Sequence, residues 1–582
     1  MIFNKYRSII AALAVAFLAS CTIEVDDFQP SAGTDASGNA VDFTTYVALG
    51  NSLTAGYTDG AWVAKAQANS YPQLIANSLQ SVNLGANGFT QPLVSNSSKA
   101  YFGTQLVLTN AGPSALPTIN VDGARASDNI TPGTYHNMAV PGIRAVDMAV
   151  PGYGVANPLF GYFSSEATAT VLNDAAAANA TFFSVWLGAN DVLGFATSGG
   201  SLGSNDILQA TAITPVETYQ AAMTQVLETM SANGANGVIL NIPNIMEAAL
   251  FNFMPSDLEG VLGLAGVPFT EDILALVNGF MASTIGDAKN PTITAVATPS
   301  IDPGDGELIN AVAAAAATAP SIDKDPNVPS DLAYTVIFLQ LTTDPENPLS
   351  PADAMTYLAS VEGQTQIAGF VGLGLNITWA QMNAEQAIAD SDSYMQEQGT
   401  YPVFTMESNQ MPYYDATSPT GMRQSEVGTK FTLTAQGKIT ALVGVIVGGG
   451  DLPEDLQEVL PVPANGEALI ASDVEAVETA IGEYNEFLKS EADARGFAYV
   501  DTRSIMHEAV TGIIIDGVTY TTEYLSGNLF SLDGAHLTQR GYAVIANYTI
   551  EAINNKYGAK IPTVQQNDYP VVEETAVPAP AN

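Results

Sequence analysis

Residues 46–57 read YVALGNSLTAGY, and this stretch decides the expected fold. Its first four residues form a short apolar run typical of a buried strand, and Gly50 ends that run. Ser52 follows at the turn where a helix would begin. In α/β sheets, reactive groups lie at the carboxyl ends of strands. The stretch therefore predicts a strand of a parallel sheet with a reactive hydroxyl group at its end.

Three further apolar runs, at residues 181–187, 237–242 and 497–500, indicate three more strands. Continuous apolar strands of this kind suit a parallel sheet that is covered on both faces. Helices are expected between them. Residues 214–217 (TPVE) and 472–475 (SDVE) have the pattern of capping boxes, and apolar residues at spacings of three and four follow each. Because each helix leads into a strand, the sequence predicts a doubly wound α/β domain.

One domain is expected to span residues 43–561, interrupted by an insertion at residues 247–424. The insertion is rich in Ala, Gly, Met and Pro, and short apolar helices are expected in it at residues 257–266 and 272–281. We interpret it as mainly helical, in a position where a lid would form. The tail, residues 562–582, contains several Pro and Glu residues and is expected to be disordered.

The charge of the chain excludes one class of partner. The 582 residues include 59 Asp and Glu against 17 Lys and Arg, which gives a formal net charge of −42. Only 13% of the residues are charged and 47% are hydrophobic, so the composition is that of a folded protein. Nucleic-acid binding needs clustered Lys and Arg, and a strongly negative surface repels phosphates. No nucleic-acid partner is expected.

The amino-terminal residues predict where the protein is located in the cell. Lys5 and Arg7 precede an apolar run at residues 9–19, which is shorter than the roughly 20 residues of a membrane span but suits a signal peptide. Residues 18–21 read LASC and resemble the lipobox of bacterial lipoproteins, in which the peptide is cut before the cysteine and the cysteine is lipidated. The alternative is an ordinary secretory signal that contains a cysteine.

We therefore expect a lipoprotein signal peptide at residues 1–20 and lipidation of Cys21, the only cysteine. A Ser- and Gly-rich flexible tether is expected at residues 21–42. The body would then be anchored to the bacterial outer membrane by lipid, on the periplasmic or the cell-surface face.

The histidines limit the possible chemistry. With only His136, His507 and His536, and with Cys21 assigned to lipid, a Cys/His zinc site lacks ligands. No Walker or dinucleotide-binding glycine pattern follows an expected strand. We therefore expect no metal and no cofactor.

His536 has the neighbours of a catalytic base. In residues 533–536 (DGAH), the carboxylate of Asp533 can curl back through the Gly-Ala turn and accept the Nδ1 proton of His536. The ring is then held with Nε2 free to act as a base, and Ser52 is the candidate nucleophile. The alternatives are a structural turn at Asp533 and a helix N-cap at Ser52.

Four blocks in this order resemble the SGNH (GDSL-type) hydrolase family. They are residues 50–56 (GNSLTAG), 137–142 (NMAVPG), 188–191 (GAND) and 533–536 (DGAH). The resemblance covers the expected domain apart from the insertion. It implies a flavodoxin-like, three-layer α/β fold and a serine hydrolase. An α/β-hydrolase is the nearest alternative, but its G-x-S-x-G motif is not matched.

The resemblance also implies a role for each matched residue. Ser52 would attack an ester carbonyl, His536 would transfer the proton, and Asp533 would orient the imidazole. The oxyanion would be held by the backbone N–H groups of Ser52 and Gly142 and by the side-chain amide of Asn190.

Two neighbours of these residues matter as well. Asp191 is expected to brace the loop that carries Asn190. Asn51 departs from the family, which usually has Asp at this position.

The resemblance implies an esterase or lipase that acts on carboxylic esters. Lipid acyl esters are the expected substrates, because the insertion is apolar and contains Met residues that adapt to irregular apolar ligands. Acetyl esters of carbohydrates remain an alternative. The rival from another class is a non-catalytic binding or adhesion lipoprotein that retains the scaffold, for which Asn51 and the large insertion are the motives.

Overall fold

The computed structural model describes residues 29–94, 102–103, 105–109, 112–115, 131–202, 211–264, 266–271, 410–414, 422–436, 438–439, 463 and 465–572. The expected signal peptide, Cys21 and residues 22–28 of the expected tether lie outside the described residues. So do residues 272–409 of the expected insertion and the end of the tail, residues 573–582.

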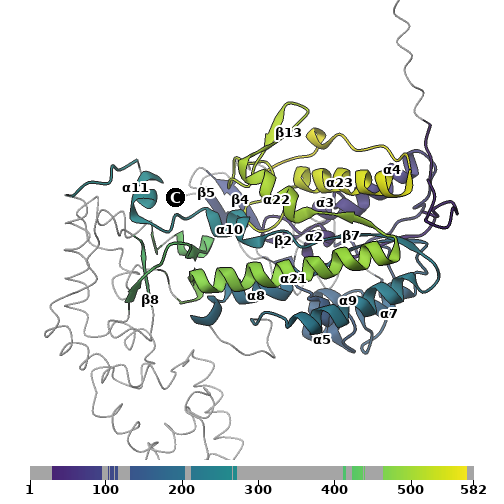
Figure 1. Cartoon of the computed structure of the whole chain (residues 1–582), viewed down its shortest axis with the longest axis horizontal. Coiled ribbons are helices and arrows are strands. Elements are labelled where there is room, and N and C mark those ends of the chain that lie inside the picture. The colour runs from purple at the N-terminus through teal and green to yellow at the C-terminus, as the bar shows by residue number, and fades with distance from the viewer. Residues whose placement is uncertain are drawn as a thin grey trace, which may run out of the picture.

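A four-stranded parallel sheet forms the centre of the described part (Figure 1). Its strands are β1 (Tyr46–Gly50), β6 (Phe182–Trp186), β7 (Asn236–Leu240) and β12 (Ala498–Val500), in the order β1-β6-β7-β12. Each apolar run of the sequence forms a strand, as predicted. The protein is therefore an α/β protein.

Alternate residues of each strand pack on opposite faces of this sheet. In β1, Val47 and Leu49 belong to one hydrophobic cluster, and Tyr46 and Ala48 belong to the other. All four side chains are fully buried. Because both faces are covered, every position needs an apolar residue, which explains the continuous apolar runs.

Helices cover both faces of the sheet (Figure 1). One face packs against α7 (Val171–Ala176), α8 (Asn190–Thr197), α9 (Val216–Ser231) and α21 (Ala471–Arg495). The other face packs against α4 (Tyr71–Ser81), α22 (Thr502–Thr511) and α23 (Gln539–Tyr557). On the first face, the rings of Tyr219 and Tyr484 stack with their centroids 4.0 Å apart.

Residues 136–140 run alongside β1 and extend the sheet. The N–H of Met138 donates to the carbonyl of Ala48 (2.9 Å), and the N–H of Val140 donates to the carbonyl of Gly50 (3.0 Å). These evenly spaced bonds follow the pattern of a parallel ladder. They bring the residues after this segment to the carboxyl end of β1.

Helices α9 and α21 are present as predicted, but the capping boxes are not. No side chain caps α9, which begins at Val216, and Thr214 lies outside its N-cap position. Helix α21 begins at Ala471, and the carboxylate of Asp473 accepts hydrogen bonds from the N–H (2.9 Å) and the hydroxyl (2.8 Å) of Ser201. The helix thus begins before Ser472, the residue that the pattern assigns to the N-cap, and the N-cap residue is Ile470.

The flexible tether predicted at residues 21–42 is wrong for its described end. The N–H of Thr34 donates to the carbonyl of Tyr557 (2.7 Å), and Ser31 and Lys560 form an antiparallel bridge. Since these backbone groups are held by the body, the described residues up to 42 belong to the folded domain.

The disorder predicted for residues 562–582 is likewise wrong for residues 562–572. The Nε–H of Arg540 donates to the carbonyl of Tyr569 (2.9 Å), and the side-chain amide of Asn547 donates to the carbonyl of Val564 (2.9 Å). Side chains on α23 therefore supply the hydrogen bonds that order this stretch.

The described margins of the insertion contain helices α10 (Ala249–Asn252) and α11 (Leu258–Leu264) and the antiparallel strands β8 (Pro412–Tyr414) and β9 (Met422–Gln424). Helix α11 confirms the short helix expected at residues 257–266. The helix expected at residues 272–281 lies outside the described residues.

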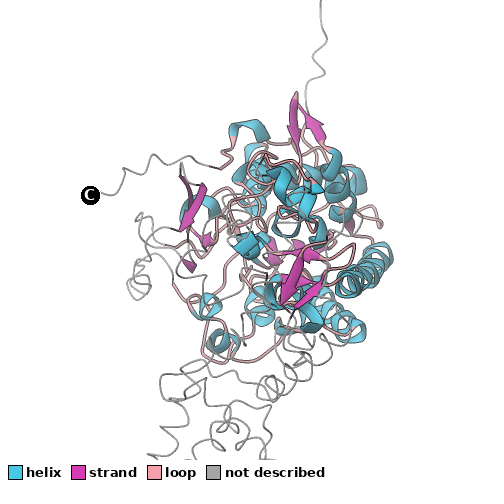
Figure 2. Cartoon of the chain, turned by 90° about the vertical axis from the view of Figure 1, so that its left-hand side faces the viewer, coloured by secondary structure: helices cyan, strands magenta, loops and turns pink. Residues whose placement is uncertain are grey.

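The remaining elements are short. The helices are α2 (Ser52–Ala55), α3 (Ala64–Gln67), α5 (Tyr153–Ala156) and α6 (Pro158–Gly161), with 3-10 turns η2 (Ala145–Asp147), η3 (Gly200–Leu202), η4 (Ile245–Glu247), η5 (Leu433–Ala435), η6 (Asn465–Glu467) and η7 (Gln566–Asp568). The two-stranded pairs are β2 (Ala61–Trp62) with β3 (Phe102–Gly103), β4 (Leu106–Thr109) with β5 (Gly112–Ala115), β10 (Lys430–Phe431) with β11 (Ala468–Leu469), and β13 (Ile513–Ile515) with β14 (Val518–Tyr520). The β13–β14 hairpin projects from the top of the molecule in both views (Figures 1 and 2). Within the described ranges, no helix is both long and apolar enough to cross a bilayer.

Candidate active site

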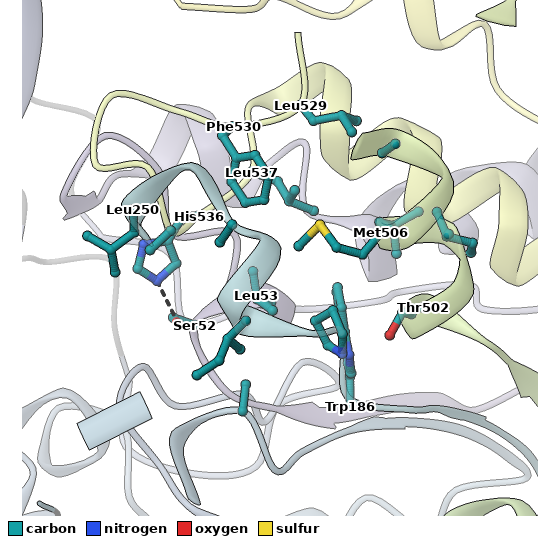
Figure 3. A pocket seen from close by; sticks show the side chains of 18 of the residues that line it. Ser52, Leu53, Trp186, Leu250, Thr502, Met506, Leu529, Phe530, His536 and Leu537 are labelled. Carbon is teal, nitrogen blue, oxygen red and sulfur yellow. Dashed lines mark hydrogen bonds between the residues drawn. The ribbon is translucent and has the colours of Figure 1, made fainter. Parts of the chain in front are cut away.

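The structure brings Ser52, His536 and Asp533 into contact. The hydroxyl of Ser52 lies 2.8 Å from Nε2 of His536, and Nδ1 of the same ring lies 2.8 Å from Oδ2 of Asp533 (Figure 3). Ser52 is the first residue of α2, directly after β1, and the other two residues lie in the loop before α23. The sequence predicted this hydrogen-bonded chain of three side chains.

The carboxylate of Asp533 is fixed by its neighbours. It accepts hydrogen bonds from the N–H groups of Gly60 (2.7 Å), Ala535 (3.0 Å) and His536 (2.8 Å), and from the hydroxyl of Ser531 (3.1 Å). Burial alone would raise the pKa of Asp533, but the imidazole of His536 and these hydrogen bonds hold that pKa well below its usual range. An ionised Asp533 favours a proton on Nδ1 of His536, which leaves Nε2 to accept the proton of Ser52.

Residues 57–60 clamp the loop that carries the histidine. The ring of Tyr57 packs against the ring of His536 with centroids 4.6 Å apart. The N–H of Asp59 donates to the hydroxyl of Ser531 (2.9 Å), and the Asp59 carboxylate accepts from the N–H of Leu532 (3.0 Å). Because the same loop follows α2, it couples the position of the imidazole to the position of the serine.

The turn at Ser52 depends on two neighbours. A Cβ atom on Gly50 would lie 1.9 Å from the Thr54 hydroxyl oxygen, so only glycine fits where β1 turns into α2. The side-chain oxygen of Asn51 accepts a hydrogen bond from the N–H of Leu53 (3.0 Å) and caps this helix. The amide of Asn51 therefore supplies an acceptor for the cap without a charge.

Three hydrogen-bond donors follow the carboxyl ends of β1, of the segment paired with it and of β6. The N–H of Ser52 is the first of α2, so the helix offers it no partner. Gly142 is exposed with φ +83°, and the amide of Asn157 holds the preceding carbonyl of Pro141 (2.9 Å). Neither N–H donates a hydrogen bond to another described residue. The third donor is the side-chain amide of Asn190.

The amide of Asn190 is oriented by the loop after Gly142. One of its N–H groups donates to the carbonyl of Ile143 (2.9 Å), which leaves the other available. The neighbouring Asp191 accepts from the N–H of Ala145 (2.8 Å), so it braces this loop as predicted. Burial raises the pKa of Asp191 to about 7, and the hydrogen bond from Ala145 offsets part of this rise.

The other histidines lie elsewhere. Nδ1 of His136 lies 2.8 Å from the hydroxyl of Thr90, and burial lowers the His136 pKa. Nδ1 of His507 lies 2.8 Å from a carboxylate oxygen of Glu247, and 80% of its side chain is exposed. Neither histidine has a hydrogen bond to Ser52.

Sequence reasoning missed the residues that hold Asp533 from a distance. Gly60 lies 473 positions before Asp533, and no local pattern signals their hydrogen bond. The positive φ angles of Asp59 (51°) and Gly60 (73°) indicate a tight turn, for which the DG dipeptide is a recognised signal. The turn could therefore be predicted, but not its partner.

No group of three or more His, Cys, Asp or Glu side chains among the described residues is arranged to hold a metal ion.

Comparisons with known proteins add no name to this geometry. The chain matches no model of a known protein family and no curated protein sequence. What the site can do is therefore argued from its residues.

Proposed function

We propose that the protein is a serine esterase that hydrolyses carboxylic acyl esters. The observation that carries this proposal is the continuous hydrogen-bonded chain from the hydroxyl of Ser52 through the ring of His536 to Asp533, with 2.8 Å at each step. A serine hydroxyl is a weak nucleophile by itself and needs an adjacent base that a third group orients.

The mechanism uses these atoms in two steps. Oγ of Ser52 attacks the ester carbonyl carbon while Nε2 of His536 takes its proton. The tetrahedral intermediate collapses, the proton passes to the departing alkoxide, and the acyl group remains on Ser52. A water molecule then attacks this acyl-enzyme with the same base, which releases the acid and restores the hydroxyl. Asp533 stabilises the imidazolium in both steps.

The oxyanion is the charge that must be stabilised. The N–H groups of Ser52 and Gly142 and the second amide N–H of Asn190 are the donors we assign to it. Preorganised donors of this kind act on charge that develops only in the transition state, so they cost no reorganisation when the reaction occurs.

The family and the cellular location of the protein are part of the same proposal. We assign the chain to SGNH (GDSL-type) hydrolases with a flavodoxin-like fold and a largely helical insertion at residues 247–424. The lipobox-like LASC at residues 18–21 supports lipidation of Cys21 and an outer-membrane location. The strand-end position of Ser52 and the three-residue spacing of Asp533 and His536 support the family assignment.

The rival proposal is a non-catalytic binding lipoprotein, and one observation that favours it is Asn51 in place of Asp. The side chain of Asn51 accepts the hydrogen bond of the helix cap, so the change of residue leaves the turn before Ser52 intact.

One assay tests the esterase. The mature chain with Cys21→Ser, which needs no detergent, would be offered p-nitrophenyl acetate and butyrate. We expect turnover, and a loss in kcat of about 10^4-fold or more for Ser52→Ala. The exposed Ser37 provides a matched control, since Ser37→Ala should keep full activity. An inactive wild-type protein, or an active Ser52→Ala variant, would contradict the proposal.

A further inference from the structure

A cavity begins at Ser52 and His536 and extends toward α22 and α23. In Figure 3, these two residues lie at one side of the cavity, Thr502 lies at the other, and Met506 lies between them. The space that the centre of a water molecule can occupy is about 90 Å³. This is several times the space that one water needs, so the cavity has room for a narrow ligand.

The wall of the cavity is almost entirely apolar. Apart from Asn51, Ser52, Asn190 and His536 at its catalytic end, only Trp186 and Thr502 bring polar side-chain atoms into this wall.

The two polar side-chain groups in this wall are already paired. Nε1 of Trp186 donates to the carbonyl of Asn241 (2.9 Å), and the hydroxyl of Thr502 donates to the same carbonyl (2.5 Å). A sugar ring would lose its hydrogen bonds to water here and find few replacements, at a cost of about 1–3 kcal/mol for each unpaired group. The wall is suited to hydrocarbon.

Helix α22 supplies one side of the cavity in a regular pattern. Thr502, Ile505, Met506 and Ala509 line it at spacings of three and four, which is one face of a helix. Met506 is half-buried in the middle of this face, and its flexible side chain can move to fit a ligand. Val510 follows on the same helix, is 48% exposed and does not line the cavity.

We propose that this cavity holds the acyl chain of the substrate, and that the enzyme is selective for linear fatty acyl esters over acetyl esters. This inference rests on the proposed esterase function. The acyl group becomes bonded to Oγ of Ser52 in the first step and remains there, after the alcohol has left, until water releases it in the second. A cavity that begins at this oxygen therefore holds the acyl side of the ester. Met506 limits the length of chain that fits.

The first test varies the two sides of the ester separately. With p-nitrophenyl esters from acetate to dodecanoate, below their aggregation concentrations, kcat/KM should rise about fourfold for each added methylene until the cavity is filled. With acetate esters of alcohols of increasing length, kcat/KM should stay nearly constant. A flat acyl series, or a rise confined to the alcohol series, would overturn the assignment.

The second test changes the cavity. Met506→Ala should move the preferred acyl length upward, and Met506→Trp should move it downward. The matched changes Val510→Ala and Val510→Trp should leave the profile unchanged. If the Met506 variants keep the wild-type profile, Met506 does not limit chain length.

A binding experiment separates this proposal from the esterase itself. A brominated dodecanoate should quench the fluorescence of Trp186 in the Ser52→Ala protein, and Trp186→Phe should remove that quenching. Quenching of Ser52→Ala, combined with a wild-type protein that hydrolyses no ester, would refute the proposed function but keep the cavity. Turnover of short esters without quenching or chain-length preference would refute the cavity and keep the function.

Discussion

Two histidines of this protein form the same bond and have different surroundings. Nδ1 of His536 lies 2.8 Å from Asp533, and Nδ1 of His507 lies 2.8 Å from Glu247. The side chain of His536 is 18% exposed, whereas that of His507 is 80% exposed. The second ring nitrogen of His536 meets the hydroxyl of Ser52.

The carboxylates differ as well. Both oxygens of Asp533 accept hydrogen bonds, whereas Oε2 of Glu247 is buried without a hydrogen-bond partner in the described part of the chain. The comparison teaches that a histidine–carboxylate contact does not define a site. The His536 pair differs in having the hydroxyl of Ser52 at its far nitrogen and a carboxylate that several donors fix.

The largest expected difference between the two pairs comes from neutralising the carboxylates. Asp533→Asn should lower kcat by about 10^4-fold, because the amide no longer holds the imidazole in the required tautomer. Glu247→Gln is the matched change and should leave kcat within about twofold. Steady-state kinetics with p-nitrophenyl butyrate measure both. Equal effects of the two substitutions would mean that the carboxylates beside His536 and His507 do not differ in their importance for kcat.

A smaller loss of kcat is expected when the amide donor beside the His536 pair is removed. Asn190→Ala should lower kcat by about 10^2–10^3-fold, the usual effect of losing one oxyanion donor, with a smaller change in KM. The exposed Asn77 on α4 is the control, since Asn77→Ala should change neither constant. If Asn190→Ala raised KM alone, Asn190 would bind the substrate rather than the transition state.

The smallest effect concerns stability against pH. Since the folded-state pKa of Asp533 is lowered, its ionised form stabilises the fold above the unfolded-state pKa of about 3.9, and this contribution is lost as pH falls below that value. The difference in melting temperature between the wild type and Asp533→Asn should therefore shrink as the pH falls from 5 toward 3. Circular dichroism melts measure it.

The control for this experiment is Asn190→Ala, which removes no titratable group from the same site. Its difference from the wild type should not shrink in the same pH range. A constant difference for Asp533→Asn down to pH 3 would mean that Asp533 is not held in its ionised form.

Local sequence patterns predict the four strands and the contact between Asp533 and His536. Residues 46–49 are apolar without interruption because both faces of β1 are covered, and this pattern can be read locally. Asp533 and His536 are three positions apart, so one short loop is enough to join their side chains. Gly50 is needed because Thr54 packs where its Cβ would be, and it marks the turn before Ser52.

Only the tertiary structure decided which distant groups meet. Ser52 and His536 are 484 positions apart, and the pairing of Gly60 with Asp533 has no signal in either segment. Asp473 on α21 accepts hydrogen bonds from Ser201, 272 positions away, and no local pattern signals this contact. The apolar cavity beside Ser52 arises in the same way, from side chains of several elements. Local patterns fix what each segment can do, and the packing of the segments decides which partner each side chain finds.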